Sequence, residues 1–340
     1  MKKYLKFVAL AVVAFALNAC GESSAESAKS AESSIKPLAS INRPECIAPA
    51  APGGGFDLTC KLAQVSLLDT KLLSKPMRVT FMPGGLGAVA MNSIIANRAK
   101  DANAIVAFSS GTLLNITQGK HGKYNENNVR WLASAGVDYG CVAVKADSPY
   151  KNLKDLVDAL KKNPKSVTFG AGAAVGGQDW LQTAMVAKLA NLDSKQMSYV
   201  AFEGGGEVLS ALLGGHIQVL SGATGEITPY VESGSVRILA VFADKRLDGE
   251  LWSDIPTAKE QGYDVKWEIV RGYYLAPQVS DEEYNWWVDI FEKLYQSDEF
   301  KAQRAQRGLF EFNKSGAEFD AFVKEQTASF VKYNKEFDIK

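Results

Sequence analysis

The residues with the clearest chemical potential are three consecutive glycines near the start of the predicted folded region. Gly53, Gly54 and Gly55 lie between a short apolar segment and a helix that we expect to begin at Asp57. Without Cβ atoms, the backbone can turn tightly and a ligand can approach it closely. The unpaired N–H groups and the positive dipole end of the helix would then attract an anion. No Gly-Lys-Ser/Thr sequence follows, so this is not a P-loop.

The same arrangement recurs along the chain. Loops of small residues follow strands predicted at 77–81, 104–108, 166–169 and 198–202. This alternation of strand, loop and helix is typical of a mainly parallel sheet covered by helices. In such sheets, ligands bind beyond the carboxyl ends of the strands. The sequence therefore predicts an α/β fold in which the glycine loops gather at one binding site.

Several loops of this kind could bind a carboxylate through backbone N–H groups and hydroxyls. One helix N-terminus contributes roughly 0.3–1 kcal/mol at an exposed site, whereas micromolar affinity requires about −8 kcal/mol, so several loops must act together. The candidate ligand-binding residues are Pro52, Gly53, Gly54, Gly55, Phe56, Asp57, Ser109, Ser110, Gly111, Thr112, Gly170, Ala171, Gly172, Ala173, Gly176, Gly177, Gln178, Gly204, Gly205, Ser221, Thr224 and Arg271.

Two charged candidates need separate interpretations. Arg271 is the basic residue nearest the expected junction between the two halves of the chain. It could make a bidentate contact with a carboxylate, or it could form a structural ion pair. Asp57 has the wrong sign to contact a carboxylate, so we expect it to cap its own helix or to bind a ligand hydroxyl or a bridging water.

Residues that could catalyse a reaction are scarce. His121 lies in a polar run that predicts a surface loop, and His216 follows two glycines at a predicted turn. The sequence has neither a Gly-x-Ser-x-Gly elbow nor a His-Glu-x-x-His motif, and its cysteines and histidines lack zinc-binding spacing. The glycine series from Gly170 to Gly176 imitates a dinucleotide fingerprint, but the required acid would be Glu203, later than expected. We therefore predict no catalysis, no cofactor and no metal, with an exported dinucleotide-dependent α/β enzyme as the alternative.

The second half of the chain repeats the plan of the first without repeating its sequence. This predicts two α/β lobes, each a mainly parallel sheet flanked by helices, with the ligand between them. We expect residues 43–140 and 266–340 to form lobe 1 and residues 141–265 to form lobe 2. The extended segments Leu132–Val144 and Val265–Ala276 would cross between the lobes and act as hinges. Two helices with capping-box spacing are expected to close the chain.

The N-terminal residues carry export signals rather than a core. Lysines precede an apolar run at 7–17 that is too short to span a bilayer, which predicts a signal peptide at 1–19. The sequence around Cys20 resembles a bacterial lipoprotein signal, so we expect lipidation there, with simple cleavage after Ala19 as the alternative. Residues 20–42, rich in Ser, Ala, Glu and Lys, would form a flexible tether.

Composition and cysteine content agree with an exported globular protein. The chain has 340 residues, a length that is enough for two domains. Of these residues, 46% are apolar and 22% are charged. Removal of residues 1–19 leaves 35 basic and 38 acidic residues. The sequence contains no basic patch of the kind that would indicate nucleic-acid binding. In an oxidising compartment, Cys46 and Cys60 could form a disulfide that braces the first glycine turn, or they could be two small buried residues. Cys141 is expected to be a buried free thiol.

An ordered series of short motifs extends from about Arg43 to the C-terminus. They are Pro52-Gly53-Gly54-Gly55-x-Asp57, Pro83-Gly84-Gly85-x-Gly87, Ser148-Pro149-Tyr150-x-Asn152-Leu153-x-Asp155-Leu156, Phe169-Gly170-Ala171-Gly172, Gly204-Gly205-Gly206-Glu207, Leu213-Gly214-Gly215-His216-Ile217, Arg237-x-Leu239-Ala240-Val241, Pro256-Thr257-x-x-Glu260-x-Gly262 and Ala276-Pro277. Together they resemble the extracytoplasmic solute receptors of tripartite tricarboxylate transporters, the Bug-type receptors.

The resemblance implies a periplasmic binding protein with a two-lobed, type II-like clamshell. Such a protein closes on a small carboxylate and delivers it to a membrane partner with one large and one small subunit. Main-chain groups of Gly53–Asp57 and Gly170–Gly177 would hold the carboxylate, often through bridging waters. We expect a monomer. A subunit that senses the acid for a signalling system is a further alternative.

The resemblance also points to a cargo. The Cys46 and Cys60 pair, Phe56 and the Arg271-Gly272 segment are most similar to the tricarboxylate receptors, which favours citrate. Many family members have a histidine after the second glycine loop, where this chain has Gln178-Asp179-Trp180. We therefore expect a di- or tricarboxylate ligand, with citrate as the first choice.

Overall fold

The structure is a computed structural model that describes residues 35–172 and 175–336. The predicted signal peptide at 1–19, the lipidation residue Cys20 and the loop residue Ala173 lie outside the described residues. The predicted tether is described from residue 35 onward. That part lies against the folded body, since the Trp286 indole donates a 2.9 Å hydrogen bond to the Lys36 carbonyl.

Strands and helices alternate along most of the chain. The strands are β1 (Glu45–Ala48), β2 (Arg78–Phe81), β3 (Ala104–Ser109), β4 (Arg130–Lys145), β5 (Thr168–Ala171), β6 (Ser198–Ala201), β7 (Val219–Ala223), β8 (Val236–Val241) and β9 (Glu268–Leu275). The helices are α1 (Gly55–Asp69), α2 (Ala88–Asn97), α3 (Ser110–Thr117), α4 (Leu153–Lys162), α5 (Gln178–Leu189), α6 (Gly205–Leu213), α7 (Thr224–Glu232), α8 (Asp281–Gln296), α9 (Asp298–Gln306) and α10 (Gly316–Glu336).

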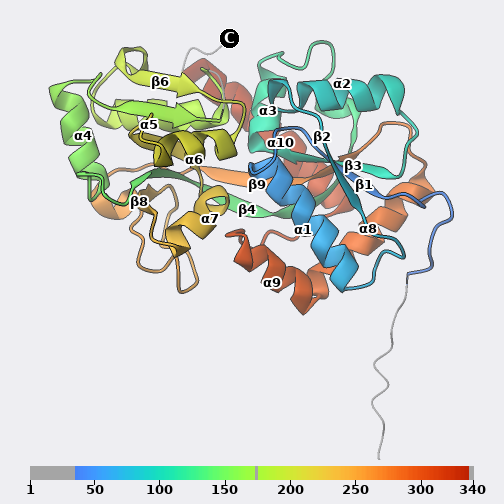
Figure 1. Ribbon diagram of the computed structural model, residues 1–340. Coiled ribbons are helices and arrows are strands. Elements are labelled where there is room, and N and C mark those ends of the chain that lie inside the picture. The colour runs from blue at the N-terminus through green and yellow to red at the C-terminus, as the bar shows by residue number, and fades with distance from the viewer. Residues whose placement is uncertain (1–34, 173–174, 337–340) are drawn as a thin grey trace, which may run out of the picture. The chain divides into compact units, whose positions relative to one another are not determined.

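The strands form two parallel groups joined by antiparallel strands. In lobe 1, β1 pairs in parallel with β2 and β3, and in lobe 2, β5 pairs in parallel with β6 and β7. The hydrogen-bonded order is β2-β1-β3-β9-β4-β7-β5-β6, and β8 also pairs with β4. Figure 1 shows the two groups on either side of β4 and β9. The predicted two-lobed α/β fold is confirmed, with antiparallel strands at the junction.

The two segments expected to cross between the lobes are β4 and β9. The 16-residue β4 pairs with β9 from Arg130 to Tyr139 and with β7 and β8 from Gly140 to Lys145. The lobes therefore share one long strand, and their loops are positioned from a common frame. The lobe boundaries themselves remain our prediction.

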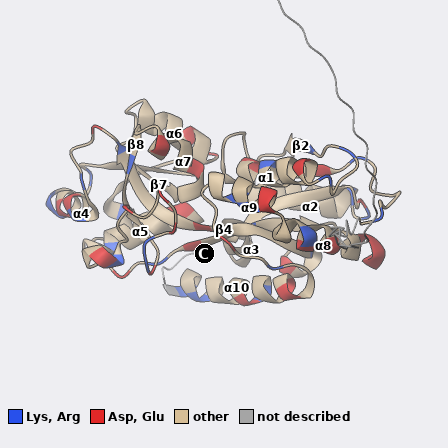
Figure 2. Ribbon diagram, turned by 90° about the horizontal axis from the view of Figure 1, so that it is seen from below, with Lys and Arg blue, Asp and Glu red and all other residues tan. Residues whose placement is uncertain are grey.

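Helices cover this sheet on its outer sides. The C-terminal helix α10 packs on β4 and α3, and α1 packs on β1 and β3. Figure 2 shows α10 lying beneath α3 and β4, with acidic and basic residues interspersed along it. Among the described residues, no helix is long and apolar enough to cross a membrane.

Four helices begin differently from the sequence-based expectation, and one of them, α6, begins at Gly205, which we expected in a loop. Helix α1 begins at Gly55, two residues before Asp57, with Gly54 in the extended N-cap conformation. Ser110 and Thr224, expected in loops, are the first residues of α3 and α7. Helix α3 is stabilised at its start because the backbone N–H of Ser109 donates to the Thr112 hydroxyl at 3.4 Å. These residues therefore present helix N-termini rather than flexible loops.

The C-terminal region contains three helices rather than the two that we expected. The capping box at the start of α8 is confirmed, because Ser280 and Glu283 exchange backbone-to-side-chain hydrogen bonds. Helix α9 was missed because its sequence is strongly polar and only Phe300 and Arg304 are buried. Ser297, which accepts a hydrogen bond from the Phe300 N–H, separates it from α8.

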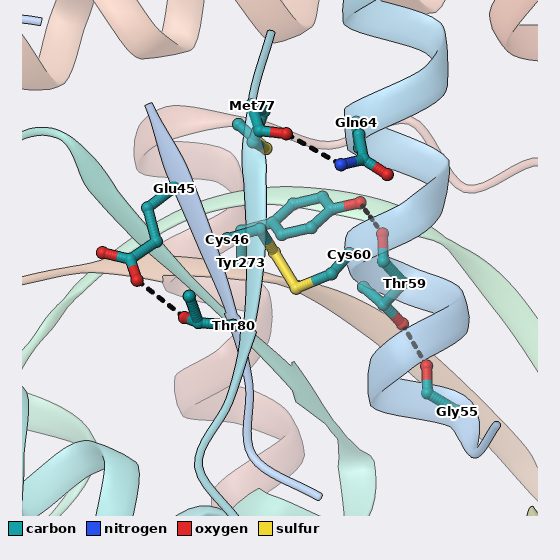
Figure 3. Close-up of a disulfide and its surroundings, with 9 residues drawn as sticks. All are labelled: Glu45, Cys46, Gly55, Thr59, Cys60, Gln64, Met77, Thr80 and Tyr273. Carbon is teal, nitrogen blue, oxygen red and sulfur yellow. Dashed lines mark hydrogen bonds between the residues drawn. A yellow bond between two sulfur atoms is a disulfide. The ribbon is translucent and has the colours of Figure 1, made fainter. Parts of the chain in front are cut away.

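The predicted disulfide is present. Cys46 of β1 and Cys60 of α1 are bridged, with their Cα atoms 5.5 Å apart. Figure 3 shows the bridge between strand and helix, beside the Tyr273 ring, whose hydroxyl donates a 2.7 Å hydrogen bond to the Thr59 carbonyl. The first glycine loop is thus held by a covalent bond between its two flanking elements. Cys141 is a buried free thiol, as expected.

Candidate ligand-binding site

The first glycine loop presents the N-terminus of α1. The first N–H groups of a helix lack an intrahelical partner. In α1, no side chain of the N-cap residue Gly54 takes the place of that partner. Asp57 lies in the first turn and reaches back to the loop, where its Oδ2 accepts a 2.7 Å hydrogen bond from the Gly53 N–H and a 2.8 Å contact from Lys61. Asp57 Oδ1 is buried without a hydrogen-bond partner. Asp57 therefore ties down the loop and keeps one free acceptor.

The second glycine loop has a similar internal tie. The N–H of Gly172 donates to Asp179 Oδ2 at 3.2 Å, although Asp179 lies beyond the loop in the first turn of α5. The Gly176 carbonyl accepts a 2.8 Å hydrogen bond from the Gln118 side chain of lobe 1. Gln178, the first residue of α5, packs against Gly111, and its Oε1 is buried without a partner.

A third loop, at the start of α6, meets both of the others. The nitrogen of Gly205 lies 3.5 Å from the place that a Cβ on Gly54 would occupy and 3.2 Å from the corresponding place on Gly172. A Cβ on Gly206 would lie 3.2 Å from the Pro52 carbonyl oxygen. Side chains at Gly172 and Gly206 would be tightly crowded because the backbones approach closely, and at Gly206 and Gly54 this approach is between the two lobes. The structure thus brings the predicted loops from both lobes together.

Arg271 lies at this junction and forms the structural ion pair that we considered. It is only 2% exposed, and its Nε and Nη2 atoms contact Asp138 Oδ2 at 3.1 and 2.8 Å. Nη2 also contacts Glu226 Oε1 at 3.0 Å, and Nη1 lies against Gly55. Asp138 and Glu226 were not among the predicted site residues. An isolated acid within the apolar β4 segment was the available signal for Asp138.

The junction contains more carboxylates than cations. Burial, with further repulsion from Asp179 and Asp138, raises the pKa of Glu226 to about 7 despite its contact with Arg271. Burial also raises the pKa of Asp179, whose hydrogen bonds to Gln178 and the Gly172 N–H only partly offset it. One guanidinium therefore lies among three carboxyl groups.

The predicted hydroxyl residues are largely engaged with protein partners. Thr224 donates to Asp138 at 2.6 Å, Ser110 accepts from the Val270 N–H at 2.9 Å, and Ser221 bonds with Thr183 at 2.9 Å. These contacts hold the loops and helix ends in place. To donate to a ligand, Thr224 and Ser110 would have to give up Asp138 and Gln326, whereas Ser221 only accepts in its contact with Thr183.

The two histidines differ in environment. His216 is exposed at a turn, but the expectation that His121 lies on the surface is wrong, because the residue is only 1% exposed. Its backbone carbonyl accepts a long hydrogen bond from Asn92 of α2, and both ring nitrogens are buried without partners. Burial lowers the pKa of His121 to about 4. The polar neighbours Lys120 and Gly122 are exposed, which explains why the sequence suggested a surface loop.

A cavity opens beside the meeting loops. It has a volume of about 280 Å³ and lies between α1, α7 and the end of α9. Its polar lining includes Gly54, Asp57, Lys61, Glu226 and Arg307. The cavity therefore offers a solute the backbone of the first glycine loop and charged groups of both signs.

Two α/β lobes that share the long strand β4 and bring glycine loops together beside a cavity are the arrangement of a bilobal solute-binding protein. The family described as Tripartite tricarboxylate transporter family receptor matches residues 63–334. The chain belongs to this family, which confirms the resemblance found in the sequence. The family consists of solute-binding receptors rather than enzymes, so the chain is not expected to catalyse a reaction.

Individual relatives agree with this assignment. The UPF0065 protein in the gbd 5′ region of Cupriavidus necator is 29% identical over 251 residues, which cover 73% of this chain and 70% of the relative. MatC from Rhodopseudomonas palustris with bound malate has a TM-score of 0.74 at 17% identity, covering 85% of this chain and 98% of that one. Rpa4515 of R. palustris with adipate has a TM-score of 0.76 at 17% identity, covering 87% and 97%. The two structural similarities establish the shared fold.

Proposed function

We propose that the protein is a periplasmic receptor that captures a small di- or tricarboxylate between its lobes and delivers it to a tripartite tricarboxylate transporter. The observation that carries this proposal is the meeting of three glycine loops, at the starts of α1, α5 and α6, beside a cavity. Backbone N–H groups at helix N-termini favour carboxylates. The malate and adipate bound to proteins of the same fold support this class of ligand.

The cargo would be held mainly by the backbone. Arg271 already contacts Asp138 and Glu226, so it does not offer a free bidentate face. The backbone N–H groups at the starts of α1, α5 and α6 are our candidate anion-binding groups from both lobes. Citrate is our first candidate, because the sequence motifs are most similar to the tricarboxylate receptors.

Thermal unfolding of the purified chain tests this function. Carried-over ligand is removed by partial unfolding and dialysis, and the panel contains citrate, isocitrate, tricarballylate, malate, succinate, glutamate and benzoate. A ligand at about a hundred times its dissociation constant should raise the free energy of unfolding by about 2.7 kcal/mol. A stabilising shift with one of these acids supports the receptor, and the responding acid identifies the cargo. No shift with any acid contradicts the proposal.

Paired variants locate the site. Gly54→Asp and Gly172→Asp should abolish the shift, because each places a carboxylate where the loops meet. Gly234→Asp is the matched control, because its position at the turn after α7 has open space around it and a left-handed backbone that Asp tolerates. Retention of the full shift in both loop variants would place the ligand elsewhere.

We further propose that the protein is anchored by a lipid on Cys20. Incorporation of a radiolabelled fatty acid into the wild-type chain, and its loss in Cys20→Ser, would support the anchor. An unlabelled wild-type chain released freely from the periplasm would instead indicate cleavage after Ala19.

A further inference from the structure

The position of Glu226 differs from that of an ordinary ion-pair partner. Its carboxylate lies between the first residues of two helices from different lobes. A Cβ on Gly55 would lie 2.5 Å from Glu226 Oε1, and a Cβ on Gly205 would lie 1.6 Å from Oε2. Gly205 has no room for a side chain because the carboxylate occupies the space beside it, whereas at Gly55 the Arg271 guanidinium, with Nη1 1.8 Å from a Cβ, and the carboxylate fill the space together. Arg271 completes the arrangement with its 3.0 Å contact to Oε1.

This place has the properties of an anion site. The first residues of two helices and a guanidinium lie beside it, and helix N-termini and guanidinium groups attract a negative group. In the chain itself, that group is the Glu226 carboxylate. Burial and the carboxylates of Asp179 and Asp138 oppose this attraction and raise the pKa of Glu226. The Glu226 side chain is 17% exposed and lines the 280 Å³ cavity, so a solute can reach it.

A second observation indicates that the cavity accepts a ligand. Asp57 also lines it and is only 1% exposed, yet its Oδ1 atom has no hydrogen-bond partner. A buried acceptor without a donor carries a free-energy cost that a ligand hydroxyl would remove. A residue of the cavity wall thus holds a buried unpaired acceptor, and the neighbouring anion position is filled by the Glu226 carboxylate.

The charges around Glu226 come from every element packed against it. Helix α6 contributes Glu207, whose carboxylate is turned to the Glu203 N–H. The other charged groups near Glu226 are Arg271 of β9, Asp138 of β4, Asp179 of α5, Asp57 and Lys61 of α1, and Arg307 after α9. A ligand carboxylate added beside an ionised Glu226 would therefore increase an existing excess of negative charge.

We propose that Glu226 is an internal competitor of the solute: its ionised carboxylate occupies the place of a ligand carboxylate, and an anionic solute binds when Glu226 is protonated. This inference rests on the proposed carboxylate-receptor function. It makes solute binding proton-linked, since protonation of Glu226 removes the competing charge. Binding should therefore strengthen as the pH falls through neutrality.

The size of the effect follows from the fraction of protein with protonated Glu226. Because burial raises the pKa of Glu226 to about 7, most molecules carry a protonated Glu226 at pH 6 and an ionised one at pH 8. The apparent dissociation constant varies inversely with the fraction of molecules in which Glu226 is protonated. It should therefore rise about tenfold from pH 6 to pH 8.

Isothermal titration calorimetry of the full chain tests this inference with every acid of the panel at pH 6, 7 and 8. For the acid that binds, wild type should show the tenfold pH dependence. Glu226→Gln should bind about tenfold more tightly than wild type at pH 8, and its dissociation constant should change less than about twofold with pH. Glu232→Gln, an exposed position on the same helix, should behave as wild type.

Proton uptake provides a test that requires no variant. Titration of wild type at pH 8 in two buffers of different ionisation enthalpy should reveal that close to one proton is taken up per bound anion. Anion binding without pH dependence or proton uptake would overturn the role of Glu226 and leave the receptor function intact. Weaker binding by Glu226→Gln would overturn it too, because Glu226 would then hold the ligand. No binding of any acid by any form would overturn the proposed function itself.

Discussion

The loops that lead into α1 and α5 use the same backbone device in different ways. In each, an aspartate from the first turn of the helix reaches back to a glycine N–H. Asp57 accepts from Gly53 at 2.7 Å, and Asp179 accepts from Gly172 at 3.2 Å. Each tie holds one glycine of the loop against the first turn of its helix, and the other N–H groups at the helix end have no intrahelical partner.

The two loops differ in whether a covalent bond holds their flanking elements and in which groups contact the aspartate carboxylate. The α1 loop has a disulfide between its flanking strand and helix, and Asp57 has a cation, Lys61, at 2.8 Å. Asp179 instead receives side-chain amides from Gln178 and Gln182, at 3.1 and 3.3 Å. Lobe 1 thus presents a rigid loop with a compensated charge. Lobe 2 presents a loop whose buried carboxyl is held in a more neutral form, because burial raises its pKa.

The covalent brace should give the largest difference between the loops. Replacing both Cys46 and Cys60 with alanine should lower the free energy of unfolding by about 3 kcal/mol, because the bridge restricts a loop with a sequence separation of 14 in the unfolded chain. Urea unfolding with and without a thiol reductant measures this loss. The reductant should destabilise wild type but not the double variant.

Cys141→Ala is the control, because Cys141 is a buried thiol outside both loops. It should cost about 1 kcal/mol, independent of reductant. A loss below about 1 kcal/mol in the double variant would show that the α1 loop is held by its packing alone, and the proposed contrast in rigidity would fail.

The two aspartates should respond differently to neutralisation. At pH 8, Asp57→Asn should cost about 1–2 kcal/mol, because it weakens charge-assisted hydrogen bonds to Gly53 and Lys61. Asp179→Asn should be neutral or stabilise by up to about 1 kcal/mol, because the ionised carboxylate is disfavoured in its buried site. Urea unfolding of both variants at pH 5 and pH 8 checks this prediction.

The pH dependence gives the sign of the Asp179 effect. The pKa of the Asp179 carboxyl is raised on folding, so the carboxyl contributes stability at low pH. That stability is lost as the pH rises through the pKa that the group has in the folded protein. The advantage of Asp179→Asn over wild type should therefore appear at pH 8 and shrink at pH 5. An equal loss for both aspartate variants at pH 8 would remove the electrostatic contrast between the loops.

Local features of this fold could be predicted from the sequence because their causes are local. Gly53, Gly54 and Gly55 indicate a tight turn before a helix, and the Ser280 and Glu283 spacing indicates a capping box. The close spacing of Cys46 and Cys60 around the turn made a bridge a reasonable expectation. In each case, the interacting groups lie within about fifteen residues.

The charged centre of the site could not be predicted in this way. Asp138 and Glu226 contact Arg271 across 133 and 45 residues of sequence. Their meeting depends on the register of β4 against β9, where irregularities in β4 place Gly136 opposite Arg271 and Asp138 two pairs further along. A pattern of residue types does not determine such a register.

The direction of one buried side chain was also beyond sequence reasoning. His121 is surrounded in sequence by lysines and glycines, which are typical of a surface loop. Its ring is buried near Gly87, with Nε2 3.8 Å from the place that a Cβ on Gly87 would occupy, and such a tertiary neighbour is a property of the assembled lobe. Similarly, α3 contains residues with weak helix propensity, and packing against α10 stabilises it.

The ion pair in the α1 loop should give the smallest effect. The Lys61 side chain is 52% exposed, so solvent screens its contact with Asp57. Lys61→Met should cost about 0.5 kcal/mol at low salt and less at high salt.

Lys324→Met is a matched control, because Lys324 pairs with Asp320 at the same spacing and is also 52% exposed. Its partner is 35% exposed, whereas Asp57 is almost completely buried, so the control should lose less. Urea unfolding of both variants at two salt concentrations measures the difference. A loss in Lys61→Met as large as that in Asp57→Asn would show that the cation, rather than the Gly53 hydrogen bond, gives the first loop its stability.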